Sequence, residues 1–172
     1  TAQSGYDGKG QLRVATAADL PTAWQSLGKV PCVLEGLVPF EREISVIVAR
    51  GADGDIQCFP PVENHHENHI LAETIVPAPI SAAVAAKAIA LAESIARYGD
   101  LVGLIAVEMF VLADGEVVVN ELAPRPHNSG HWSMDACQTD QFEQCVRAAC
   151  GLPLGDTTIL APARMRNLLG DA

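Results

Sequence analysis

The sequence predicts an α+β fold in which antiparallel sheets pack against helices. Two stretches rich in apolar and β-branched residues are interrupted by the turn dipeptides Asp53–Gly54 and Asp114–Gly115, which is the pattern of β-hairpins. Between these hairpins lies a long alanine-rich segment that suits a helix. Strands and helices do not alternate regularly, so a parallel sheet built from βαβ units is not expected.

The first half of the chain is expected to consist of short strands and one helix. Gly28 closes the helix, and Pro60–Pro61 stops the second strand of the first hairpin. The expected elements are a strand at 11–15, a helix at 18–27, strands at 32–35, 43–50 and 56–59, a loop at 63–69 and a strand at 70–76.

The second half is expected to carry the longer helix and the longer hairpin. Ser81 is a good N-cap for a helix that reaches Arg97, with Gly99 near its end. Gly151 and Pro153 end the last helix. The expected elements are a helix at 82–97, hairpin strands at 103–112 and 116–122, and a helix at 140–150.

Charge and hydropathy exclude two classes of partner. The 172 residues include 11 Lys and Arg against 21 Asp and Glu, a net charge of −10, so the chain repels a nucleic-acid backbone. The longest apolar stretch, 82–96, contains Lys87 and Glu93 and is too polar to cross a membrane. The five cysteines form no CxxC pair, which favours reduced thiols and a cytoplasmic protein.

Counting outward from Asp114–Gly115 predicts which residues face each other across the longer hairpin. If these two residues form the loop, six steps outward on each side place Glu108 opposite Glu121. Directly opposed residues point to the same side of a sheet, with Cβ atoms about 4.5–5.5 Å apart. Strict alternation puts Asn120 on the other face, unless a bulge near the strand end redirects it.

Two opposed carboxylates repel each other, by roughly 3 kcal/mol at an effective dielectric constant of 20. A divalent cation would offset this repulsion, and Mg²⁺ prefers hard oxygen ligands such as carboxylates completed by phosphates. In the alternative interpretation this face of the sheet is solvated, and one glutamate pairs with Arg125 or shares a proton with its neighbour. The residues alone leave both interpretations open.

Two segments in the first half could line a nucleotide pocket. The run SGYDGKGQ, 4–11, has three glycines whose backbone amides, together with Lys9, can approach phosphates, although a plain flexible turn has the same composition. Glu35 and Glu43 lie at the ends of predicted strands, where carboxylates can bind an amine or ribose hydroxyls. The backbone groups of residues 37 and 38 can offer further hydrogen bonds to such a ligand. A solvated connection is the alternative.

A histidine-rich run, ENHHENH at 63–69, raises the question of zinc. His65, His66 and His69 include an HxxxH spacing, which places two ligands on one face of a helix. The run has no helical periodicity, however. A polar loop is therefore the first interpretation, and zinc the second.

The run RPHNSGHW, 125–132, follows the second glutamate directly and is densely polar. Arg125 can bind a phosphate or a carboxylate through two hydrogen bonds. His127 and His131 can donate to an anion or transfer protons. Polar groups so close to a candidate metal pair indicate a reaction site.

Five segments, taken in order, resemble the N5-carboxyaminoimidazole ribonucleotide synthetase family of ATP-grasp enzymes, which acts in bacterial purine biosynthesis. They are GYDGKGQ, VLEGLVPFEREISVIVAR, ENHHENHI, VGLIAVEMF and VNELAPRPHNSGHW. The last is quite specific to that family. The resemblance implies an ATP-grasp core that uses ATP to phosphorylate bicarbonate to carboxyphosphate, which then carboxylates the exocyclic amine of aminoimidazole ribonucleotide.

The resemblance also implies roles for individual residues. The ligands of Mg²⁺ would be Glu108 and Glu121. The residues that bind ATP would be Gly8, Lys9, Gly10, Glu35, Gly36, Leu37, Val38, Glu43, His66, Asn120 and Glu121. The aminoimidazole would face Tyr6 and Asp7, with Asp7 placed to accept the amine proton. The catalytic residues would be Asp7, Arg125, His127, Asn128 and His131.

The sequence departs from the family pattern in two respects. Many ATP-grasp enzymes carry an asparagine two residues after the second metal-binding glutamate, where this chain has Ala123, so Asn120 or water would substitute. The family's amino-terminal α/β domain, a lysine upstream of the glycine loop and a basic carboxyl-terminal segment are not in this sequence. We expect a fragment truncated at both ends, with a smaller subdomain at 1–76 and a larger one at 77–172, that does not turn over alone.

Three other functions stay open on the sequence. Another ATP-grasp ligase, of the biotin-carboxylase type, would act on a different acceptor. A non-catalytic nucleotide-binding module would keep the acidic pair for structural reasons. A zinc hydrolase would be built on His65 and His69. The resemblance also allows a homodimer of the full-length protein.

Overall fold

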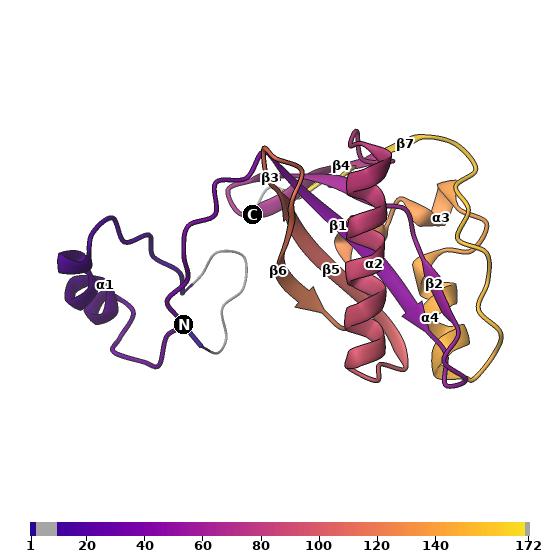
Figure 1. The fold of residues 1–172 in the computed structure, drawn as a ribbon, viewed down its shortest axis with the longest axis horizontal. Helices are drawn as coiled ribbons and strands as arrows, with labels where there is room; N and C mark the ends of the chain where they lie inside the picture. The colour runs from indigo at the N-terminus through magenta and orange to yellow at the C-terminus, as the bar shows by residue number, and fades with distance from the viewer. Residues whose placement is uncertain (3–9, 171–172) are drawn as a thin grey trace. The chain divides into compact units, whose positions relative to one another are not determined.

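The computed structural model describes residues 1–2 and 10–170 (Figure 1). The chain divides into two compact units. The first comprises residues 1–38 and 68–70, and the second begins at Pro39 and contains the remaining residues.

The first unit contains a 3₁₀ turn, η1 (Ala17–Asp19), and a short helix, α1 (Leu20–Ser26), which confirms the helix predicted at 18–27. The strands predicted at 11–15 and 32–35 are wrong. Neither segment forms a strand, and the side chains stay largely exposed, Leu34 to 73%. An apolar or alternating run becomes a strand only where a neighbouring strand supplies hydrogen bonds and a face to bury.

Among the described residues, seven strands form one sheet in the order β6–β5–β1–β3–β4–β7, with β2 paired to β1. Neighbours pair antiparallel at β1–β2, β1–β3, β1–β5, β5–β6 and β4–β7, which confirms the predicted α+β fold. The strands are β1 (Arg42–Arg50), β2 (Ile56–Cys58), β3 (Val62–Glu67), β4 (Ile70–Val76), β5 (Gly103–Val111), β6 (Val117–Ala123) and β7 (Ala163–Arg166).

A long helix, α2 (Ala82–Tyr98), covers one face of the sheet (Figure 1). Ser81 caps it by accepting a hydrogen bond from the Val84 N–H at 3.3 Å, as predicted. The alanines Ala88, Ala92 and Ala96 are fully buried, and they pack with strand residues such as the Val46 side chain in one hydrophobic core. Small side chains spaced four residues apart let the helix approach the sheet closely.

A second hydrophobic core lies on the other face of the sheet, because alternate residues of a strand point to opposite sides. It includes Ile47, Phe59 and Trp132. The segments that cover this face are η2 (Asn128–Gly130), α3 (Ser133–Ala136) and α4 (Gln141–Ala149). Asp140 caps α4 by accepting from two backbone N–H groups, so the helix predicted at 140–150 is confirmed.

The loop predicted at 63–69 is wrong, because residues 62–67 form β3 inside the sheet. The polar side chains at its start, Glu63 and Asn64, are buried but paired, whereas the last three residues are exposed. Glu63 bonds to Arg42 at 2.5 Å, and Asn64 donates to Ser45 Oγ at 2.9 Å. A buried strand that satisfies its polar groups has the composition of a loop, so an apolar pattern does not find it.

Candidate functional site

Glu108 on β5 and Glu121 on β6 are register partners, so the predicted pairing is confirmed. The turn between the strands is nevertheless longer than predicted. Val111, not Leu112, pairs with Val117, and the Gly115 N–H donates to the Leu112 carbonyl at 2.9 Å. Gly115 has a φ of 80°, which is typical of a three-residue hairpin loop that ends in a left-handed glycine.

A bulge at Asn120 compensates for the longer turn. Met109 pairs with Val119 and Glu108 pairs with Glu121, which leaves Asn120 as the extra residue. The bulge brings the two glutamates back into register. It also meets the condition under which Asn120 can turn toward the same ligand, because a bulge redirects the side chains beside it.

His127 holds the Glu108 carboxylate. His127 Nε2 lies 3.1 Å from Glu108 Oε1, and the two side chains are 13% and 18% exposed. Burial raises the pKa of Glu108, but the hydrogen bond from His127 and the charges of His127, His66 and Arg125 outweigh it, so the pKa is lowered. Glu108 is therefore held as a carboxylate.

A line of buried hydrogen bonds leads to the other ring nitrogen of His127. Asn64 Nδ2 donates to Ser45 Oγ at 2.9 Å, and Ser45 Oγ donates to Ser129 Oγ at 2.8 Å. Ser129 Oγ lies 2.8 Å from His127 Nδ1, and the Ser129 backbone N–H donates to the same nitrogen at 3.4 Å. A backbone N–H can only donate, so in the neutral form of the ring Nδ1 is the acceptor and Nε2–H faces the carboxylate.

Glu43 and His66 form a second pair on the same face of the sheet. His66 Nδ1 lies 2.5 Å from Glu43 Oε2. The hydrogen bond from Glu43 raises the pKa of His66 against the effect of burial, and the charges of Glu43 and Glu108 raise it further. Glu43 shares the face of Glu108 because Ser45, two residues along the strand, pairs with Glu108.

The Glu43–His66 pair predicts a pH dependence of stability. The folded-state pKa of His66 lies above its unfolded value of about 6.5, so the stabilisation is fully present below that pH and is lost as pH rises through the folded pKa. We expect the wild type to have a higher free energy of unfolding than Glu43→Gln at low pH, and this difference to shrink as the pH rises above about 6.5. Urea unfolding between about pH 5.5 and 9 measures this difference.

The matched control for this pH series is Glu73→Gln, because Glu73 pairs with Arg164, which does not titrate in this range. Its difference from the wild type should not depend on pH. Parallel pH profiles for the wild type and Glu43→Gln would contradict the prediction.

The other predicted catalytic residues of the 125–132 run bond to neighbours other than the two glutamates. His131 stacks on Phe142 with ring centroids 5.7 Å apart, and burial and the charge of His127 lower its pKa. Arg125 is exposed and donates to the Pro126 carbonyl at 3.1 Å. Asn128 begins η2, and its carbonyl accepts from the His131 N–H at 3.1 Å. Of the predicted catalytic residues described here, His127 alone bonds directly to a glutamate.

Sequence reasoning missed several residues that shape this face. Ser45 and Ser129 join the hydrogen-bonded line to His127, and nothing in their sequence context marks them. Phe40 and Phe110 stack beside Glu43, with ring centroids 4.3 Å apart and planes 6° from parallel. The spacing of Phe110, two residues after Glu108 on one strand, could have placed it on this face.

Gly130 is required by close packing. A Cβ at this position would lie 2.2 Å from Ile47 Cδ1 and 2.6 Å from Gln141 Oε1, and both neighbours are buried. We expect Gly130→Ala to lower the free energy of unfolding by about 2 kcal/mol, because buried neighbours have no room to move. Gly170→Ala, where a Cβ meets nothing within 4 Å, is the control. Equal urea midpoints for the two variants would contradict this packing.

The remaining predicted nucleotide residues belong to the first unit or lie outside the described residues. Glu35, Gly36 and Leu37 are exposed, Leu37 to 75%, and Val38 is partly buried. Gly10 has a φ of 74°. The predicted residues outside the described part are Tyr6, Asp7, Gly8 and Lys9.

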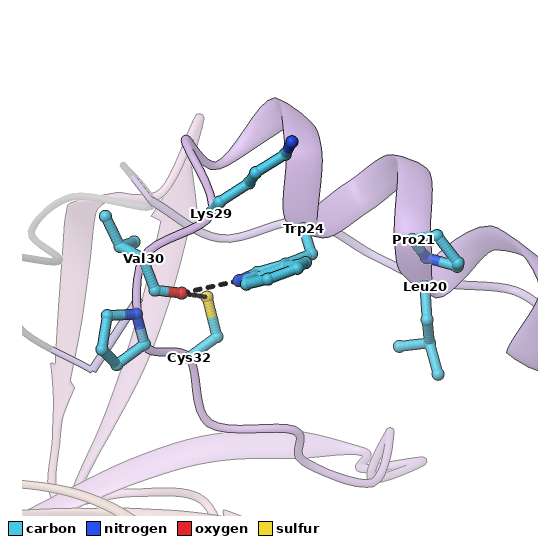
Figure 2. Close-up of a pocket in the computed structure, with 7 residues that line it drawn as sticks. Leu20, Pro21, Trp24, Lys29, Val30 and Cys32 are labelled. Carbon is cyan, nitrogen blue, oxygen red and sulfur yellow. Dashed lines mark hydrogen bonds between the residues drawn. The ribbon is translucent and has the colours of Figure 1, made fainter.

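The first unit also has a pocket of about 630 Å³ between α1 and the segment that follows it (Figure 2). Trp24 Nε1 and Cys32 Sγ both donate to the Val30 carbonyl, at 2.8 and 3.3 Å. The lining is apolar except for Lys29. None of the predicted site residues lines it.

The donor set on the sheet fits magnesium better than zinc. The paired glutamates Glu108 and Glu121 offer hard oxygen ligands, and Mg²⁺ is commonly held by one or two carboxylates with phosphates and water. Within residues 1–2 and 10–170, no group of three or more His, Cys, Asp or Glu side chains could hold a metal by itself. Of the HxxxH pair, His65 lies on β3 and His69 lies in the turn after it with a left-handed φ of 66°, so the two do not share one face of a helix as a zinc site of this spacing requires.

A family model described as the ATP-grasp domain matches residues 1–142. The chain belongs to the ATP-grasp family. The N5-carboxyaminoimidazole ribonucleotide synthase of Bacillus subtilis (strain 168) is 52% identical over 171 residues, and the match covers 99% of this chain and 45% of the relative. The ATP-grasp chain therefore spans less than half the length of that relative.

Solved structures give the same relationship. An ADP complex of an N5-carboxyaminoimidazole ribonucleotide synthetase is 53% identical, with a TM-score of 0.91 over 96% of this chain and 44% of that one. The synthase of Aspergillus clavatus in complex with ADP and 5-aminoimidazole ribonucleotide is 34% identical, with a TM-score of 0.88 over 94% and 44%. No helix in the described part of this ATP-grasp chain has the length and apolar character to span a membrane.

Proposed function

We propose that this ATP-grasp chain is part of an ATP-dependent carbon–nitrogen ligase that carboxylates aminoimidazole ribonucleotide with bicarbonate, in de novo purine biosynthesis. The observation that carries the proposal is the pairing of Glu108 with Glu121 on the sheet face where His127 bonds to Glu108. The chain that makes this arrangement is 52% identical to a synthase of this activity.

The two glutamates would hold Mg²⁺. The ion would neutralise charge on the nucleotide phosphates during phosphoryl transfer. Glu108 suits the role because its pKa is lowered and it is held as a carboxylate. Asn120, at the bulge, is the candidate for a further contact to the phosphates, since Ala123 offers no side-chain ligand.

Residues outside the hairpin would also bind the nucleotide. Glu43 can accept hydrogen bonds from the ribose hydroxyls, and His66 lies against it. The adenine would be met by residues 35–38, and the phosphates by the glycine loop at 8–10, where Lys9 adds a positive charge.

The reaction begins when a bicarbonate oxygen attacks the γ-phosphorus of ATP and ADP leaves. The carboxyphosphate formed releases phosphate and carbon dioxide, and the amine nitrogen of the ribonucleotide attacks the carbon. Asp7 would accept the amine proton, and Tyr6 would face the aminoimidazole. The cationic guanidinium of Arg125 and the segment from His127 to His131 would enclose the anionic carboxyphosphate and keep water away from it.

Several further expectations stay predictions. They are the cytoplasmic location, the division into subdomains at 1–76 and 77–172, the homodimer of the full-length protein, and the absence of turnover by the chain alone.

A chimera tests the proposed activity. Residues 1–172 would replace the matching segment of the Bacillus subtilis synthase, which supplies the rest of the relative's length. We expect ADP release that requires bicarbonate and is stimulated by aminoimidazole ribonucleotide. Stimulation by a different acceptor alone would assign the chain to another ATP-grasp ligase. ADP binding without any turnover, in a folded chimera, would favour the non-catalytic module.

A further inference from the structure

Gln141, the first residue of α4, forms hydrogen bonds with both the backbone N–H and the backbone carbonyl of His127. Gln141 Nε2 donates to the His127 carbonyl at 2.8 Å, and Gln141 Oε1 accepts from the His127 N–H at 2.9 Å. The Gln141 side chain is fully buried. A single carboxamide thus replaces the two hydrogen bonds that a neighbouring strand would give to this residue.

Further hydrogen bonds and close packing tie Gln141 to the segment that follows His127. The Gln141 backbone N–H donates to Ser133 Oγ at 3.0 Å, and Ser133 Oγ donates to the Gly130 carbonyl at 2.6 Å. Gly130 leaves the space that Gln141 fills, since a Cβ there would lie 2.6 Å from Gln141 Oε1. Both ends of the 127–130 segment are therefore tied to the start of α4.

The position of the His127 backbone decides what its ring can reach. With the backbone held, Nδ1 meets Ser129 at 2.8 Å and Nε2 meets Glu108 at 3.1 Å. Both ring nitrogens have directional partners on opposite sides, so a small displacement of the backbone would weaken both bonds at once.

We propose that Gln141 is a positioning residue, which fixes the His127 imidazole with its Nε2–H on the Glu108 carboxylate. Gln141 acts through His127 and touches neither substrate nor metal. The inference rests on the proposed function only in taking Glu108 as a ligand of Mg²⁺. The alternative is that Gln141 merely ties a loop to a helix and contributes to stability alone.

The chain contains a matched control on the same helix. Gln144 is also fully buried, and its carboxamide grips Gly155 in the same way, donating to the carbonyl at 2.7 Å and accepting from the N–H at 2.8 Å. Gly155 is not one of the predicted site residues. Gln144→Met therefore removes an equivalent pair of side-chain to backbone hydrogen bonds and leaves the hydrogen bonds to His127 unchanged.

The test is the ¹⁵N spectrum of the histidine rings in the chain alone, in buffer well above the ordinary histidine pKa of about 6.5. The His127 signals are assigned by their loss in His127→Gln. In the wild type the two ring nitrogens should resonate far apart, as one fixed tautomer requires. Gln141→Met should bring them together, because the two tautomers then interconvert, whereas Gln144→Met should leave them unchanged. Both variants should lose melting temperature by similar amounts.

Unchanged His127 signals in a folded Gln141→Met variant would overturn the proposal and leave Gln141 a purely structural residue. If Gln141→Met does not fold, Gln141→Glu replaces it, since glutamate keeps the size and the acceptor but loses the donor to the His127 carbonyl. The same shift of the His127 signals is then expected, and its absence overturns the proposal. Neither result depends on ATP, so the proposed activity is tested separately.

Discussion

Replacing Glu121 by glutamine is expected to weaken the Mg²⁺-dependent binding of ADP by about 100-fold. Glutamine keeps the size of the side chain but removes its charge, so Glu108 would be left as the one carboxylate facing the cation across the hairpin. Changes to residues that merely support metal ligands already cost about 10–100-fold, so the loss of a ligand should reach the upper end of that range. Calorimetric titration of ADP in Mg²⁺ and in EDTA measures the effect.

Glu116→Gln is the control for this titration. Glu116 lies at the turn of the same hairpin, is exposed, and pairs with Lys87 at 2.7 Å, so its replacement removes the same charge away from the sheet face. Its affinity for ADP should equal that of the wild type. Equal affinities for the wild type and Glu121→Gln, both dependent on Mg²⁺, would place the metal elsewhere.

The largest effect on stability is expected for Phe59→Ala. Phe59 is 1% exposed and meets the Trp132 ring edge to face, with centroids 6.3 Å apart. Trp132 ends the 125–132 run, so this contact anchors the run on the second hydrophobic core. We expect the free energy of unfolding to fall by about 3–5 kcal/mol, because the lost ring leaves a cavity that the packed core does not fill.

Urea unfolding, followed by far-UV circular dichroism, measures the effect of Phe59→Ala. The control is Phe142→Ala, since Phe142 is 40% exposed and loses less apolar burial. Its cost should stay below about 1.5 kcal/mol. Similar losses for the two variants would show that the 125–132 run is not anchored through Phe59.

The sequence predicted the elements whose local signals agree with their surroundings. The Ser81 cap and the Asp140 cap marked two helices, and Asp114–Gly115 marked the hairpin. Counting from that turn paired Glu108 with Glu121 although two steps were wrong. The longer turn shifted the register by one residue and the bulge shifted it back. Neither the turn length nor the bulge can be predicted from a single sequence, because both depend on how the paired strands twist.

The sequence failed where tertiary partners decide the structure. Residues 63–69 were predicted to be a loop, although 62–67 form a strand, because polar groups such as Glu63 and Asn64 find their partners, Arg42 and Ser45, only in the folded sheet. For the same reason the support of His127 could not be predicted. Gln141 lies fourteen residues farther along the chain and bonds to the backbone, which no side-chain pattern records.

The most direct test is a crystal structure of the chain with ADP and Mn²⁺ in place of Mg²⁺, phased to show the anomalous signal of manganese. One manganese peak should lie between the carboxylates of Glu108 and Glu121, with phosphate oxygens of the nucleotide completing the coordination. A peak bound by only one of these glutamates, or by neither, would contradict the assignment of the paired strands as the metal site.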